Sequence, residues 1–257
     1  MGTGAITQYV DVAQLVLYLF WAFFFGLIYY LVRENHREGY PMDVGREGGP
    51  KVTGWPVPAP KIYKTEHGDV VVPDATKDAR PLALAPLYRT SSAPLAPTGD
   101  PMLDGVGPGA WTPRADVPDV NGAGEVRIQP LRALPEYNLS KNDTDPRGMN
   151  LVAGDGKVAG TVRDAWIDRS DMLIRYLEVT VATPTGTRNV LVPMNFVRVT
   201  RGHNASVKLS ALLSTQFAQI PGTKAPDQIT LLEEEKICAY FGAGLLYATP
   251  DRQEPLV

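Results

Sequence analysis

One long uncharged apolar stretch limits the fold of this chain more than any other feature. Residues 12–32 form a run of 21 amino acids without a charged side chain, with Asp11 before it and Arg33 after it. An α-helix of that length measures about 31 Å at about 1.5 Å per residue, which is enough to cross the hydrocarbon core of a bilayer. The sequence therefore predicts a single membrane-spanning helix.

The charges beside this stretch predict its orientation. Residues 1–11 contain no Lys or Arg, whereas Arg33 and Arg37 follow the stretch. Because basic residues near a span tend to stay in the cytoplasm, we expect a periplasmic N-terminus and a cytoplasmic remainder. A cleaved signal peptide is the alternative, but it would have a basic start, a shorter core and small residues at a cleavage site. This core instead ends in Tyr29-Tyr30.

Composition narrows the function classes. The net charge is −3 and no basic cluster is present, which argues against nucleic acid as a partner. The single Cys238 has no partner for an internal disulfide, in agreement with a reducing cytoplasm. Scattered histidines argue against a zinc site, and GxSxG, P-loop and GxGxxG motifs are missing from the sequence. The motifs thus argue against an enzyme, including a membrane-anchored hydrolase.

Residues 33–150 are rich in proline. Of the 23 prolines, 17 lie between Pro41 and Pro146. Proline fixes φ and lacks a backbone donor, so we expect an extended segment with short strands such as 69–72, without long helices. A disordered linker is one interpretation. The segment also holds aromatic residues that are costly to leave in water, Trp55, Tyr63, Tyr88 and Trp111. These favour an ordered coil that lies against a partner.

The remainder, residues 151–257, predicts a mainly β domain. Short β-rich runs separated by Gly, Pro and Asn turns occupy residues 157–166, 173–181, 188–193, 196–200 and 229–232. Such a pattern is typical of a small antiparallel barrel. Three glutamates then precede apolar residues at helical spacing, which predicts a C-terminal helix from about residue 233. Gly242 and Gly244 would permit that helix to pack closely.

Several motifs resemble one known family. They are Gly26-Leu27-Ile28-Tyr29-Tyr30-Leu31, Arg37-Glu38-Gly39-Tyr40-Pro41, Ala96-Pro97-Thr98-Gly99-Asp100-Pro101-Met102, Asp104-Gly105-Val106-Gly107-Pro108 and Leu231-Leu232-Glu233-Glu234-Glu235-Lys236-Ile237-Cys238. They closely resemble the H subunit of the purple-bacterial photosynthetic reaction centre. The resemblance implies one transmembrane helix in the bacterial inner, intracytoplasmic photosynthetic membrane and a cytoplasmic PRC-barrel domain.

The resemblance also implies partners and cofactors. The chain is expected to cover the cytoplasmic face of the L and M subunits, in contact with membrane lipid and with an antenna complex as a neighbour. The L and M subunits are expected to hold the bacteriochlorophyll, bacteriopheophytin, quinones and non-haem iron, and this chain to bind none of them.

A role in proton delivery to the secondary quinone follows from the same resemblance. Asp171 corresponds to the innermost acid of the H subunit, where the family usually has glutamate, and Asp168 is a nearby acid. Arg175 and Glu234 are expected to form an associated ion pair. Aspartate is one methylene shorter than glutamate, so a water molecule is expected to bridge the gap at Asp171.

The outer end of the expected proton route departs from the family. Ala123 and Glu125 stand where histidines are usual, and Asn121 stands where an aspartate is usual. Asp119 and Glu125 are the acids left to collect protons there, while His67 matches a histidine of the family. From the residues alone, Asp119, Glu125 and His67 could equally be solvated surface groups, whereas for Asp171 a surface turn is the less favoured alternative.

The expected function is therefore that of a non-catalytic H subunit that stabilises the reaction centre and assists protonation of the secondary quinone. The alternative is a membrane-tethered PRC-barrel adaptor that binds another protein complex.

Overall fold

The apolar stretch forms one long helix. The computed structural model describes residues 4–7, 9–40, 42, 54–66, 68–74, 80–88, 93–202 and 205–253. Helix α1 (Val12–Asn35) begins after Asp11, whose carboxylate accepts a hydrogen bond from the backbone N–H of Gln14 at 2.7 Å. This is the usual capping arrangement at a helix start. The helix continues past the predicted end at residue 32, because the charged residues that follow are good helix formers.

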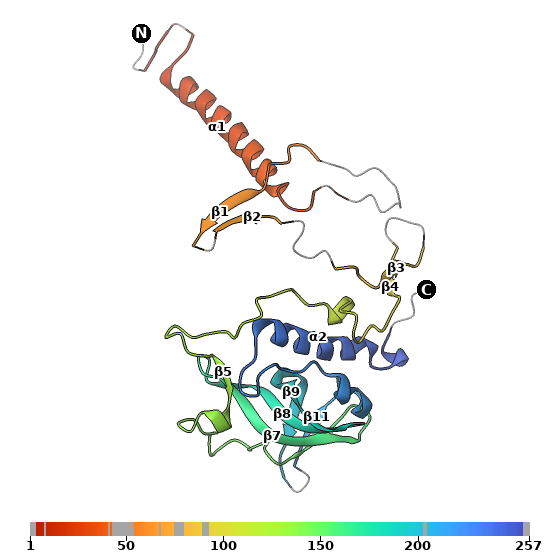
Figure 1. Cartoon of the computed structure of the whole chain (residues 1–257). Helices are drawn as coiled ribbons and strands as arrows, with labels where there is room; N and C mark the ends of the chain where they lie inside the picture. Colours follow the sequence, from red (N-terminus) through yellow and green to blue (C-terminus); the bar gives the residue numbers. More distant parts are fainter. Residues whose placement is uncertain are drawn as a thin grey trace. The chain divides into compact units, whose positions relative to one another are not determined.

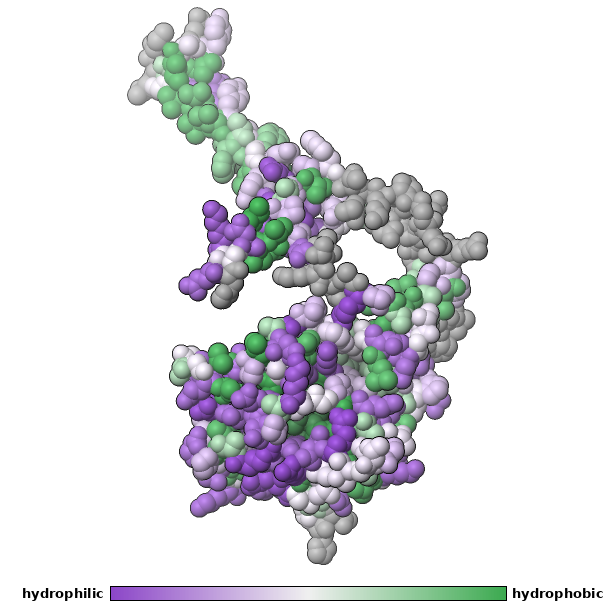
Figure 2. Space-filling view, viewed as in Figure 1, coloured by the Kyte–Doolittle hydropathy of each residue, from purple (hydrophilic) through white to green (hydrophobic). Residues whose placement is uncertain are grey.

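Helix α1 is long and apolar enough to cross a membrane, and none of its residues is buried against the rest of the described chain. Hydrophobic residues cover its surface (Figure 2). Beyond it, Lys61 Nζ lies 3.0 Å from Glu34 Oε2, so the following segment turns back to the end of the helix. That segment continues into a hairpin of strands β1 (Lys61–Thr65) and β2 (Gly68–Val72), which agrees with the strand predicted at 69–72.

Contacts divide the chain into two compact units. One contains Met1–Ala79 with Leu87–Ala93, and the other contains Arg80–Pro86 with Pro94–Val257. The second unit therefore begins well before the domain boundary predicted at residue 150. The many prolines argue against long helices and central strands in this segment. They do not prevent an irregular coil from packing on the barrel of the same chain, and this packing moves the boundary toward the N-terminus.

Short elements join the proline-rich coil to the second unit. Strands β3 (Leu84–Pro86) and β4 (Leu95–Pro97) pair with each other, and β5 (Ile128–Pro130) pairs antiparallel with β7. Met102 and Val106 are buried, with 8% and 1% of their surface exposed. Part of the coil thus packs against its own chain.

The barrel domain is built on one twisted sheet, drawn from green to blue in Figure 1. Its strands are β6 (Asn150–Val152), β7 (Val158–Asp168), β8 (Leu173–Thr183), β9 (Gly186–Pro193), β10 (Val197–Thr200) and β11 (Ser206–Leu209). They lie in the order β10-β11-β6-β7-β8-β9, with β5 beside β7, and only the β11–β6 pair is parallel. The predicted mainly β domain is confirmed.

Helix α2 (Leu231–Tyr247) lies along the sheet (Figure 1). It begins earlier than the predicted residue 233, because Thr230 accepts a hydrogen bond from the backbone N–H of Glu233 and caps the helix. The strand predicted at 229–232 is therefore wrong. Close packing at Gly242 is confirmed, since an added Cβ would lie 2.6 Å from the carbonyl oxygen of Pro108.

Candidate functional site

Arg127, just before β5, is the centre of a cluster of carboxylates. Its Nε donates a hydrogen bond to Asp168 Oδ1 at 2.9 Å, and its Nη1 donates to Asp119 Oδ2 at 3.2 Å. Its Nη2 lies 2.7 Å from Asp171 Oδ2 and 2.9 Å from Asp168 Oδ2. The structure thus brings three predicted site residues together around one guanidinium, and we call these four residues the Arg127 cluster.

Asp168 is the buried member of the cluster. It ends strand β7 and has 0% of its surface exposed. Burial raises the pKa of its carboxyl, but hydrogen bonds from Arg127 and from the backbone N–H groups of Asp171 and Ser170 outweigh burial, so the pKa is lowered overall. Oδ2 has no hydrogen bond, although it lies in ion-pair contact with Arg127.

Asp171 is the exposed member, at the turn between β7 and β8. Its side chain is 49% exposed, and the next residue, Met172, has a positive φ of 54° and is 70% exposed. A non-glycine residue in this backbone region is uncommon and marks a tightly defined turn. The turn presents Asp171 to the outside of the chain while Arg127 holds its carboxylate.

Glu234 approaches the cluster from helix α2. Its Oε2 accepts a hydrogen bond from the hydroxyl of Tyr176 at 2.7 Å. Burial raises the pKa of Glu234, whereas the Tyr176 hydrogen bond and the charge of Arg175 lower it, and burial is the larger effect. The carboxyl of Glu234 therefore holds a proton to a higher pH than an ordinary glutamate.

A pocket of about 650 Å³ lies between Glu234 and two members of the Arg127 cluster, Asp119 and Arg127. Asp119, Arg127, Arg175, Tyr176 and Glu234 all line it. Polar groups of this kind around a cavity that is wide enough for several waters provide the donors and acceptors that a chain of water molecules needs.

The expected ion pair between Arg175 and Glu234 is wrong for the chain as described. Within the described residues, the carboxylate that Arg175 meets is Asp168, with 4.0 Å between Nε and Oδ2. Arg175 extends from β8 along the sheet toward the end of β7, while Tyr176 occupies the position at Glu234. Arg175 affects Glu234 only through its charge across the pocket.

The outer acids lie differently. Glu125 Oε2 lies 2.9 Å from Arg169 Nη2 and accepts a hydrogen bond from Asn121 Nδ2 at 3.0 Å. Glu125 is therefore outside the Arg127 cluster, although Arg169 connects to it through a backbone hydrogen bond to the carbonyl of Arg127 at 3.0 Å. His67 lies outside the described residues.

Two segments of the chain match known families. Residues 4–133 match the photosynthetic reaction centre H-chain N-terminal region, and residues 140–205 match the PRC-barrel domain. The chain belongs to the family of photosynthetic reaction centre H chains. The sequence resemblance is confirmed, as is the PRC-barrel fold.

Membership of the H-chain family also indicates which complex the chain belongs to. The chain is a reaction centre H subunit, a structural component that associates with the reaction centre complex. Helix α1 and the family match together indicate a membrane-associated, single-pass protein. The match across the N-terminal half favours the H subunit over an unrelated PRC-barrel adaptor.

The sequence analysis did not identify two residues of this candidate site, Arg127 and Tyr176. Arg127 follows Glu125 closely, yet nothing in the sequence shows that its guanidinium faces the end of β7, because the pairing of β5 with β7 creates that contact. Tyr176 lies next to Arg175. Because side chains along a strand point to opposite faces in turn, the strand predicted at 173–181 already indicates that Tyr176 and Arg175 point to opposite faces. Among the described residues, no group of three or more His, Cys, Asp or Glu is arranged to hold a metal ion.

Proposed function

We propose that this H chain covers the cytoplasmic face of the L and M subunits and carries protons toward the secondary quinone. In this proposal α1 spans the membrane with a periplasmic N-terminus, and the barrel domain is cytoplasmic. The absence of Lys and Arg from residues 1–11, with Arg33 in the last turn of α1 and Arg37 after it, supports this orientation. The pigments, quinones and iron are proposed to lie on the L and M subunits.

The observation that carries the proposal is the Arg127 cluster with the pocket that leads to Glu234. Reduced quinone must receive protons in a site shielded from water, and a relay needs acids that lie between solvent and the protein interior. Glu234 is half-buried with a raised pKa, and Asp171 is exposed on a defined turn. Glu234 lines the pocket, and Asp171 is held by Arg127, which lines the same pocket, so the two carboxyls suit the two ends of such a relay.

Each group has a proposed role. Glu234 takes a proton from water in the pocket, and Tyr176 orients its carboxylate through the 2.7 Å hydrogen bond. Arg127 keeps Asp119, Asp168 and Asp171 close together despite their like charges. Asp171 passes the proton to a water molecule that bridges toward the L subunit, because aspartate has a short reach.

The test compares Asp171→Asn with Asp145→Asn in assembled reaction centres. Asp145 is a matched control because its carboxylate is 45% exposed and paired with an arginine, as Asp171 is. We expect Asp171→Asn to slow flash-induced proton uptake and second-electron transfer, and small weak acids to restore both. An unchanged rate in Asp171→Asn and also in Glu234→Gln would refute proton delivery by this chain. If no pigmented complex that contains the wild-type chain can be isolated, the proposed association with the L and M subunits is refuted.

A further inference from the structure

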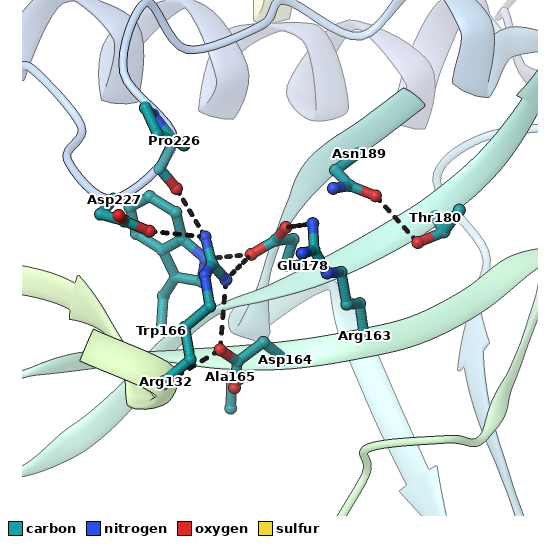
Figure 3. Close-up of polar contacts among 10 residues, drawn as sticks. All are labelled: Arg132, Arg163, Asp164, Ala165, Trp166, Glu178, Thr180, Asn189, Pro226 and Asp227. Carbon is teal, nitrogen blue, oxygen red and sulfur yellow. Dashed lines mark hydrogen bonds and ion pairs between the residues drawn. The ribbon is translucent and has the colours of Figure 1, made fainter. Parts of the chain in front are cut away.

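Arg132 joins the coil after β5 to two buried carboxylates of the sheet. It lies in a short 3-10 helix, Leu131–Ala133. Its Nη1 donates a hydrogen bond to Asp164 Oδ2 at 3.2 Å and forms an ion pair with Glu178 Oε2. Its backbone N–H also donates to Asp164 Oδ2 at 3.2 Å. Figure 3 shows the guanidinium between the two carboxylates.

The other side of the same guanidinium reaches the loop before α2. Arg132 Nη2 donates hydrogen bonds to the Pro226 carbonyl oxygen at 2.6 Å and to Asp227 Oδ1 at 2.8 Å. Helix α2 begins soon afterwards, at Leu231. One side chain therefore ties together three segments that are far apart in the sequence (Figure 3). We call these contacts the Arg132 clasp.

The sheet side of the clasp is firmly held. Asp164 and Glu178 are 4% and 3% exposed. The indole N–H of Trp166 donates to Glu178 Oε2 at 3.0 Å, and Arg163 Nη1 donates to Glu178 Oε1 at 3.1 Å. Buried carboxylates in a satisfied network resist displacement, because a lost partner leaves a charge without solvation. The sheet thus gives Arg132 a fixed point of attachment.

Two of the three joined segments carry Arg127 and Glu234, while the third, the sheet, carries Asp168 at the end of β7. Arg127 precedes Arg132 along the chain, with only β5 between them, and Glu234 follows Asp227 within the first turn of α2. Strand β5 has only three residues, which is too short to fix the position of Arg127 by itself. We propose that Arg132 is a positioning residue that fixes Arg127 and Glu234 relative to the sheet and so sets the spacing of the proton route. This proposal rests on the proposed function.

The experiment uses three variants in assembled reaction centres. Arg132→Gln breaks the clasp, whereas Asp227→Asn removes only the ion pair with an exposed carboxylate on the α2 side and keeps the hydrogen bond to the Pro226 carbonyl oxygen. Arg163→Gln is the matched control, because Arg163 meets the same Glu178 carboxylate but belongs to β7 and joins no second segment. We expect Arg132→Gln to slow second-electron transfer by up to about a hundredfold, which is the loss that a misplacement of about 1 Å can cause, and Asp227→Asn to slow it less. We expect no slowing in the control.

Two readouts separate positioning from a general loss of structure. Small weak acids, which carry protons past a misaligned relay, should restore the rate in the clasp variants. Hydrogen exchange should increase in residues 119–127 and 222–234 and remain unchanged in β11. The proposal is overturned if exchange in both segments stays at the wild-type level, or if Arg163→Gln matches Arg132→Gln. It is also overturned if Asp171→Asn slows the reaction while both clasp variants keep the wild-type rate. Wild-type rates in Asp171→Asn and Glu234→Gln would instead refute the proposed function.

Discussion

Replacing Arg127 by glutamine should destabilise the barrel domain, because it leaves a buried carboxylate without its cation. Asp168 has 0% exposed surface, and Arg127 donates the side-chain hydrogen bond to it. Removing one partner of a buried ion pair costs about 3–5 kcal/mol of unfolding free energy. We expect about 3 kcal/mol, because Arg127 is 26% exposed and Arg175 remains 4.0 Å from the carboxylate.

The loss should depend on pH. In the wild-type chain the pKa of Asp168 is lowered, so its ionised form stabilises the fold above the unfolded-state pKa, and this stability is lost as pH falls through the folded-state pKa. In Arg127→Gln, burial of Asp168 should raise that pKa, and the protonated group no longer needs a cation. The difference between the two proteins should therefore shrink by up to about 1.4 kcal/mol for each pH unit below the variant's pKa.

Urea unfolding of the full chain in detergent measures both effects. Trp166 is 1% exposed and reports on the sheet through its fluorescence. Arg147→Gln is the control, because its ion pair with Asp145 is exposed and should contribute about 0–1 kcal/mol. A loss below about 1 kcal/mol at pH 7.5 would refute the reasoning, since it would place the pair in the range of surface salt bridges. An equal loss at pH 4.5 and 7.5 would refute the role of ionisation.

Three further changes probe other contacts. Gly242→Ala should cost about 1–3 kcal/mol in urea unfolding, because the new methyl would lie 2.6 Å from a backbone carbonyl oxygen, and Gly122→Ala, which meets open space, should cost much less. Thr230→Ala removes the cap of α2 and should cost about 1 kcal/mol in the same assay. Tyr176→Phe removes a hydrogen bond that lowers the pKa of Glu234, so infrared titration of the carboxyl band should show a higher pKa.

Each of these results has a clear opposite. Equal stability of the two alanine variants would show that the coil over α2 moves freely at Gly242. An unchanged free energy of unfolding in Thr230→Ala would show that packing, and not the Thr230 cap, determines where α2 begins. A lower pKa of Glu234 in Tyr176→Phe would show that the hydroxyl does not favour the ionised carboxylate.

Local patterns predicted the elements that depend on local chemistry. The uncharged run located α1, and Pro and Gly punctuation located the hairpin at β2 and most of the barrel strands. The start of α2 was misjudged because residues 229–232 combine two β-branched residues, Ile229 and Thr230, with two leucines, which suits a strand equally well. The Thr230 cap and the Glu233 side chain decide in favour of a helix, and both act through side-chain hydrogen bonds to the backbone.

The site was predictable only where the residues carry the family pattern. Asp168 and Asp171 were identified in that way, and their shared partner was not, because Arg127 reaches them across a sheet pairing between residues far apart in the sequence. The predicted Arg175–Glu234 ion pair was wrong for the same reason, because it depends on how residues far apart in the sequence face each other. A charge pattern shows which signs are available, whereas the direction of β8 decides which carboxylate each side chain meets.

In the proposed relay, the two carboxyls differ in burial and so suit different tasks. Glu234 is half-buried and has a raised pKa, so it suits the step in which a proton is taken up from the pocket. Asp171 is exposed and held 2.7 Å from a guanidinium, so it suits the step in which a proton passes onward through water. Arg127 carries one positive charge among three carboxylates, so the Arg127 cluster stays negative and attracts protons. Arg175, whose Nε lies 4.0 Å from Asp168 Oδ2, weakens that attraction without cancelling it, because two guanidinium groups then face three carboxylates.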